Sequence, residues 1–163
     1  MLTAEKLRTL LVYENDTGDF RWIKAVPKRP AGSIAGTDKG NGYRAISIGG
    51  KLYLSHRLAW LYVYGAWPSN NIDHINGDPG DNRIPNLREC NQVQNSGNWK
   101  KAHKRNKSGY RDVYRISHTG KWGATIQIGG RSKYLGCFAS PEQASIAYRQ
   151  AAFAYFGEFF NAD

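Results

Sequence analysis

The sequence has only two cysteines and one methionine, and it lacks any apolar run of about 18 residues or more. Cys90 and Cys137 lie far apart and neither belongs to a CxxC pair, which argues against a zinc site built from thiolates. We expect two reduced, buried thiols. The absence of a long apolar run argues against a membrane span, and the charged N-terminal stretch lacks the cleavage site of a secretory signal. A cytoplasmic protein is therefore expected.

Acidic residues are also scarce. The chain has 23 Lys and Arg residues against 13 Asp and Glu residues, which gives a net charge of +10. Residues 98–135 contain ten of the basic residues and a single acid, Asp112. A clustered positive charge attracts phosphates and releases their counterions on contact. This clustering favours a nucleic-acid-binding surface over a merely basic, soluble protein.

The pattern of the chain predicts an α+β protein whose N-terminal part is rich in strands. A helix is expected over 3–13, capped by Thr3, and a strand over 20–23. The Gly49-Gly50 pair predicts a hairpin between 43–48 and 51–54. A helix over 56–65 follows, then two short strands at 72–74 and 87–89, and a helix over 91–99 capped by Asn91.

The C-terminal part predicts three strands followed by one helix. The strands are expected at 109–116, 121–128 and 132–138, and the helix at 141–156, with Ser140 as its N-cap. Its apolar stripe is expected at Ala144, Ala147, Tyr148, Ala151 and Tyr155. We expect residues 1–99 and 108–163 to form two domains joined by a basic linker at 100–107.

Four motifs occur in order between His56 and Asn98: HRLAW, DHING, DNRIPNL and QN. With this spacing the segment 56–98 resembles the HNH endonucleases of the ββα-metal type, in particular those of phages and mobile introns. The resemblance implies a homing-type endonuclease, a hydrolase that nicks double-stranded DNA or cuts both of its strands. Whether such a chain acts as a monomer or a dimer stays open.

The resemblance also assigns roles to residues. It implies that His74 is the general base and that Asp73 and Asn95 bind one divalent metal ion. Asn86 matches the family's central asparagine, which would hold the loop and the His74 ring. Oxygen ligands from Asp and Asn suit Mg²⁺ or Mn²⁺. His56 belongs to the HRLAW element, and we expect it to order the core or to contact a phosphate.

Residues 108–160 resemble the AP2 DNA-binding domain through SGYRDVYR, TGKWGATI, KYLGCF, SPEQASIAYRQAA and FGEFFN. The resemblance implies a three-stranded sheet that enters the major groove of double-stranded DNA. Two positions depart from the family: Asp112 replaces a common glycine, and Arg149 replaces a common acid. The residues expected to contact DNA are Arg111, Arg115, Lys121, Trp122, Arg131 and Lys133.

Two other functions compete with the nuclease. A DNA-binding regulator without catalysis would use the C-terminal module alone, but it would leave the arrangement of Asp73, His74, Asn86 and Asn95 without a purpose. RNA binding fits the charge but fits the sheet module less well.

The clustered charge predicts a strong dependence of DNA affinity on salt. We expect the binding constant to fall by about 0.9 log unit per log unit of salt for each phosphate contacted. Fluorescence anisotropy with duplex DNA at several salt concentrations measures this slope. A flat response would remove the basic segment from DNA binding.

Overall fold

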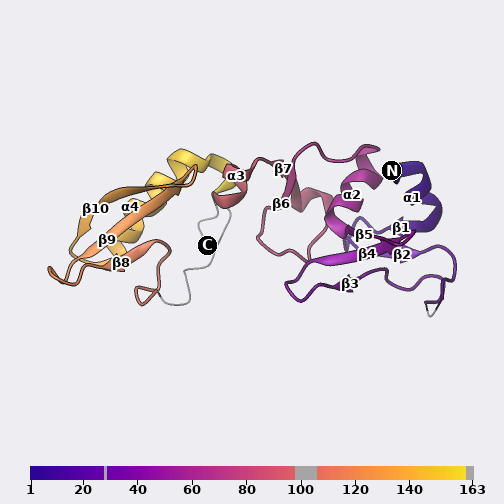
Figure 1. Ribbon diagram of the computed structural model, residues 1–163, viewed down its shortest axis with the longest axis horizontal. Coiled ribbons are helices and arrows are strands. Elements are labelled where there is room, and N and C mark those ends of the chain that lie inside the picture. The colour runs from indigo at the N-terminus through magenta and orange to yellow at the C-terminus, as the bar shows by residue number, and fades with distance from the viewer. Residues whose placement is uncertain (28, 98–105, 161–163) are drawn as a thin grey trace. The chain divides into compact units, whose positions relative to one another are not determined.

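The computed structural model of the protein describes residues 1–27, 29–97 and 106–160 and divides into two units, Met1–Cys90 and Asn91–Asp163 (Figure 1). Both units combine helices with small antiparallel sheets, so the predicted α+β class is confirmed. Most of the predicted linker at 100–107 lies outside the described residues. The predicted helix at 91–99 is observed as α3 (Gln92–Gly97), which contacts the last two helical elements of the second unit.

The first unit contains two α-helices, two two-stranded sheets and one three-stranded sheet among its described residues. Its sheets have the orders β1-β2, β3-β4-β5 and β6-β7, all antiparallel. The elements are α1 (Ala4–Leu10), β1 (Leu11–Tyr13), β2 (Phe20–Trp22), β3 (Thr37–Asp38), β4 (Arg44–Ile48), β5 (Lys51–Leu54), α2 (Ser55–Tyr64), β6 (Asn71–His74), the 3-10 turn η1 (Ile84–Asn86) and β7 (Leu87–Cys90).

The N-terminal helix is shorter than predicted. Thr3 caps it as expected, with its hydroxyl oxygen accepting a hydrogen bond from the Lys6 backbone N–H at 3.2 Å. From Leu11 the chain is extended and pairs with β2, and burial alternates, with Leu11 and Tyr13 buried and Val12 exposed. Pairing with the next strand, β2, therefore overrides the helical propensity of residues 11–13.

The first 55 residues share one core with the segment that follows them. Helix α1 contacts α2, and side chains from α1, β1 and β2 pack in the same cluster as those of α2, β6 and β7. The fully buried members of this cluster include Leu7, Leu11, Phe20, Ile46, Leu58 and Leu61. Residues 1–90 therefore share one hydrophobic core, in which the N-terminal segment packs against the hairpin β6–β7.

The second unit is a sheet of order β10-β9-β8 with one long helix packed against it (Figure 1). Val113, Ala124 and Ala144 form its buried centre, joined by Trp122 and Phe138. The elements are β8 (Val113–Arg115), β9 (Trp122–Ile128), β10 (Arg131–Phe138), α4 (Pro141–Phe156) and the 3-10 turn η2 (Gly157–Phe159). The predicted succession of three strands and a helix is confirmed.

Two expectations about burial were wrong in detail. On α4 the ring of Tyr155 is exposed and Phe156 is buried, because the buried stripe runs through Ala144, Tyr148, Ala152 and Phe156. The two cysteines are free, but only Cys90 is buried. Cys137 pairs with Gly123 on the sheet face opposite the helix-packed Ala124, so its side chain is exposed. Among the described residues, no helix has the length and apolar character needed to cross a bilayer.

Helix α2 places a histidine inside the first unit. His56 is 5% exposed, and its Nδ1 is one of the few buried polar atoms in the described chain without a hydrogen-bond partner. Burial, reinforced by the nearby His74 and Arg57, lowers the pKa of His56 to about 3. The folded protein therefore holds this imidazole neutral, which supports its role in the core rather than in a contact with phosphate.

We expect His56 to make the protein less stable in mild acid. The unfolded chain binds a proton at His56 below about pH 6.5 and the folded chain does not, so stability falls as pH drops from 6.5 towards 3. Urea unfolding at pH 6 and pH 5 should show that His56→Gln removes about 1 kcal/mol per pH unit from this dependence. Replacement of the exposed His118 by Gln is the control. An unchanged dependence in His56→Gln would show that the imidazole is protonated in the fold.

Candidate active site

The hairpin β6–β7 positions the central predicted residues. The two strands pair antiparallel with Asp73 opposite Arg88 and His74 opposite Leu87. Asp73 is 5% exposed and His74 is 4% exposed, although both carry ionisable side chains. Burying two such groups side by side is costly unless each has partners. The contacts of these two side chains therefore decide what the site can do.

Asp73 forms an ion pair with Arg88. The guanidinium donates to Oδ2 of Asp73 from Nε at 2.9 Å and from Nη2 at 2.8 Å, and both side chains are largely buried. The pairing of Arg88 with Asp73 was not predicted from the sequence. Its signal was the pairing of the two short strands, since a register with Asp73 opposite Arg88 places opposite charges across the ladder. The pair fixes the direction of one carboxylate oxygen and compensates its charge.

His74 contacts three side chains that surround its ring. Its Nε2 lies 3.4 Å from Oδ1 of Asn82, and its ring packs edge-to-face on His56 and Tyr43, with centroids 5.1 Å and 5.8 Å away. Burial lowers the pKa of His74, although the hydrogen bond that its ring makes to Oδ1 of Asn82 and the nearby Asp73 oppose this shift. A neutral imidazole is the protonation state that a general base needs.

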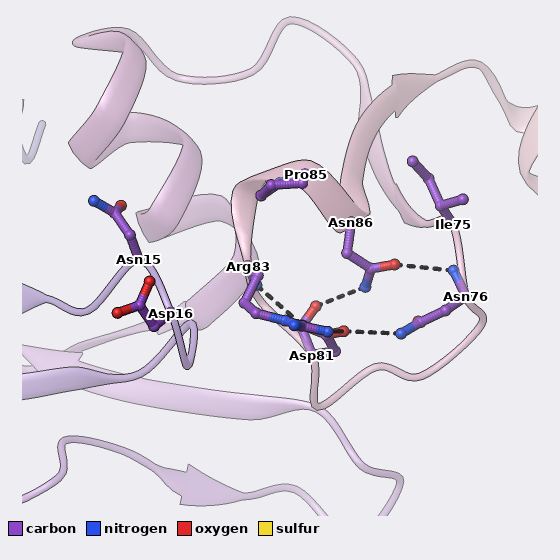
Figure 2. A pocket seen from close by; sticks show the side chains of 8 residues that line it. All are labelled: Asn15, Asp16, Ile75, Asn76, Asp81, Arg83, Pro85 and Asn86. Atoms are coloured by element: carbon purple, nitrogen blue, oxygen red, sulfur yellow. Dashed lines mark hydrogen bonds and ion pairs between the residues drawn. The ribbon is translucent and has the colours of Figure 1, made fainter.

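The loop between the strands is held by Asn86. Its Oδ1 accepts from the Asn76 backbone N–H at 2.9 Å, and its Nδ2 donates to the Asp81 backbone oxygen at 2.8 Å (Figure 2). The Asn86 backbone oxygen also accepts from the Ile75 N–H at 2.8 Å. Asn86 thus bridges both ends of the loop, in keeping with the predicted role of fixing it. The ring of His74 instead makes its hydrogen bond to Asn82, a residue with no predicted role in the site.

A polar pocket opens beside this loop. Asp81 accepts from Arg83 at 2.6 Å and from Nδ2 of Asn76 at 2.8 Å (Figure 2). These bonds, above all the one from Arg83, lower the pKa of Asp81 to about 2. The pocket is lined by Asn15, Asp16, Ile75, Asn76, Asp81, Arg83, Pro85 and Asn86. The N-terminal turn before β2 therefore forms one wall of it.

Asn95 lies on α3 and is exposed, within the second unit. The cap predicted for this helix is present, because Asn91 Oδ1 accepts from the Gln94 N–H at 2.8 Å. Within residues 1–27, 29–97 and 106–160, no group of three or more His, Cys, Asp and Glu side chains could hold a metal ion. The described candidate site thus consists of Asp73, His74 and Asn86, and a shared ion between Asp73 and Asn95 stays a prediction.

Several of the residues expected to contact DNA do not lie on the open face of the second unit's sheet. Arg115 pairs with Trp122, Lys133 with Ile126 and Arg131 with Ile128. Paired residues of neighbouring strands point to the same face, so these three cations point to the face that α4 packs against. The basic side chains are nevertheless exposed at the margins of that side. The opposite face instead presents Tyr114, Gly123, Thr125, Gln127, Ser132 and Tyr134. The alternation of side chains along β9 sorts the residues of that strand by face, but it does not show which face the cations of β8 and β10 share. The pairing register of those strands decides that.

Asp112 has the backbone conformation of a glycine. Its φ is +52°, and it is the one non-glycine residue in the described chain with a positive φ. Burial raises the pKa of its carboxyl group, against the effect of Arg111 at 3.5 Å. The left-handed region costs a non-glycine residue free energy, although Asp tolerates it better than most.

Comparison with protein families gives a match over part of the chain. Residues 53–96 match the family described as HNH endonuclease, a range that contains α2, both strands of the hairpin, Asp73, His74, Asn86 and Asn95. No curated protein matches, and no solved structure matches. HNH nucleases generally use a divalent metal ion. The chain therefore contains an HNH endonuclease domain at residues 53–96, which indicates a nuclease that acts on DNA.

Proposed function

We propose that the protein is a metal-dependent endonuclease of the homing type found in phages and mobile introns, which hydrolyses phosphodiester bonds in double-stranded DNA. The observation that carries this proposal is the buried His74 next to Asp73 on strand β6, inside the matched domain. A lone buried histidine is commonly a core residue. Here its neighbour is a carboxylate, and its loop is braced by Asn86 and Asn82.

In this proposal His74 takes the proton from the attacking water. The low pKa that burial gives to its ring keeps the imidazole neutral near physiological pH, ready to accept that proton. The edge-to-face contacts with His56 and Tyr43 restrict rotation of the ring. Asn86 keeps the loop after β6 in place, so that the catalytic group does not have to be ordered during the reaction.

Asp73 and Asn95 are proposed to hold one divalent cation, Mg²⁺ or Mn²⁺. When bound, such an ion would stabilise the charge that develops on the phosphate and the leaving oxygen. The donor chemistry fits, since both residues offer oxygen, which hard cations prefer. Asp73 already accepts two hydrogen bonds from Arg88 at Oδ2. A carboxylate has about four lone-pair positions, so it can serve the guanidinium and a cation together.

The second unit is proposed to be an AP2-like module that binds double-stranded DNA. Its fold of three antiparallel strands with one helix supports the proposal. Arg111, Arg115, Lys121, Trp122, Arg131 and Lys133 are the proposed contact residues. Several of these cations point to the helix side of the sheet. We therefore propose that they contact the phosphate backbone of DNA at the edges of the sheet. The uncharged open face would then meet the base edges.

Cleavage of plasmid DNA tests the enzyme. We expect conversion of supercoiled to open-circular DNA with Mg²⁺ or Mn²⁺, none with EDTA, and a loss of about 100-fold or more in rate in His74→Ala, the usual effect of removing a general base. His118→Ala, an exposed histidine of the second unit, is the control. DNA binding without cleavage under all these conditions would instead indicate a regulator.

The phosphate contacts of the second unit are tested by salt dependence. We expect the double variant Lys121→Gln, Arg131→Gln to reduce the slope of log affinity against log salt by about 0.9 per lost contact. The control is Arg149→Gln, which removes one positive charge from an exposed position on α4. An equal change in slope per charge removed in both variants would mean that only the overall charge matters.

A further inference from the structure

The turn between β1 and β2 lies against the loop of the candidate active site. Gly18 in this turn has φ +76°, and a Cβ atom placed on it would meet the backbone N of Arg83 at 2.5 Å and the backbone C of Asn82 at 2.6 Å. No side chain fits at that distance without moving the backbone. The N-terminal turn and the segment 82–83 are therefore packed backbone to backbone, at a position where only glycine is accommodated.

Tyr13 joins the same two segments by a hydrogen bond. Its phenol donates to the backbone oxygen of Asn82 at 2.8 Å, and Tyr13 is 6% exposed. Burial raises the pKa of Tyr13 to about 12, so the hydroxyl keeps its proton and remains a donor over the working range of pH. The ring itself is held by Phe20 and Tyr62, with centroids 5.1 Å and 5.8 Å away.

Asn82, held in this way, contacts His74 through its side chain. Its side chain is 2% exposed, and its Nδ2 donates to the Gly80 backbone oxygen at 3.1 Å. With the amide nitrogen engaged there, Oδ1 is the atom directed at Nε2 of His74, at 3.4 Å. An amide oxygen only accepts hydrogen bonds, so it selects the ring form that carries its proton on Nε2. In that form the lone pair of the neutral imidazole is on Nδ1.

We propose that Asn82 is a positioning residue that sets the orientation and tautomer of His74, and that Tyr13 and Gly18 hold Asn82 in place from outside the matched domain. This inference rests on the proposed function of His74 as general base. It gives the N-terminal segment a part in catalysis, because the chain from Tyr13 to Gly18 precedes the family match, which begins at residue 53. Tyr13 contacts a backbone atom of residue 82, and Gly18 lies against backbone atoms of residues 82 and 83. Substituting the side chains of Asn82 or Arg83 would leave those backbone atoms in place.

The tautomer can be observed without any DNA. Long-range ¹H–¹⁵N spectra of ring nitrogens in the full chain should show His74 with its proton on Nε2, assigned by its absence in His74→Gln. The chain has only four histidines, which keeps the assignment tractable. In Asn82→Ala we expect a mixture of both tautomers. A proton on Nδ1 in the unsubstituted protein would overturn the inference, whether or not the protein cleaves DNA.

Single-turnover cleavage measures the consequence for the reaction. Tyr13→Phe removes one hydroxyl and preserves the ring, so it tests the anchor without a cavity. We expect a fall of about 10-fold in the maximal rate, with the enzyme concentration at half-maximal rate changed by less than about twofold. The matched control is Tyr62→Phe, which removes a hydroxyl from the neighbouring ring of the same core cluster and should keep the full rate.

Two further pairs of variants separate positioning from folding. Asn82→Asp retains an acceptor oxygen for Nε2 but loses the donor to the Gly80 oxygen, so it should recover only part of the rate lost in Asn82→Ala. Gly18→Ala should lower the rate more than Gly32→Ala, because both glycines have positive φ but only Gly18 meets backbone atoms within 4 Å. An active protein whose Tyr13→Phe and Asn82→Ala variants cleave at the full rate would refute the inference and leave the proposed function standing. A protein without any cleavage would instead refute the proposed function.

Discussion

A buried carboxylate and a buried imidazole on consecutive residues of one strand are the arrangement on which the rest of the candidate site depends. Asp73 and His74 remain inside the first unit because each has its own partners, the guanidinium of Arg88 for the one and Asn82 with two aromatic neighbours for the other. Without these partners, burial of two such groups would oppose folding. The hairpin register that brings Arg88 opposite Asp73 is therefore a condition both for stability and for the chemistry proposed.

The polar loop between the strands is organised by amides rather than by charges alone. Asn86 ties Asn76 to Asp81, and Asn82 links Gly80 to the His74 ring. Each amide both donates and accepts, which lets one side chain join two separate parts of the loop. A loop braced in this way keeps the neutral histidine in one place, as an electrostatically preorganised site requires.

Several features followed directly from the sequence. The hairpin at Gly49-Gly50, the cap of Ser140 on α4, and the two short strands at 72–74 and 87–89 were predicted and are observed. The likeness to HNH endonucleases was read from four motifs, and residues 53–96 match that family. Local signals were sufficient there because turn glycines, capping hydroxyls and motif spacing act over a few residues. Asp73, His74 and Asn86 lie close together because they belong to one hairpin, β6–β7, whose strands are near in sequence.

The sequence by itself determined the residue types of the site and most of its local elements, since these depend on neighbours in the chain. Tertiary structure decided the partners: Arg88 for Asp73, Asn82 for His74, and Tyr13 and Gly18 for Asn82. It also turned residues 11–13 into a strand and placed Arg115, Arg131 and Lys133 on the helix side of their sheet. These outcomes depend on register and on packing between distant segments, where shifting a strand by one residue reverses every side chain.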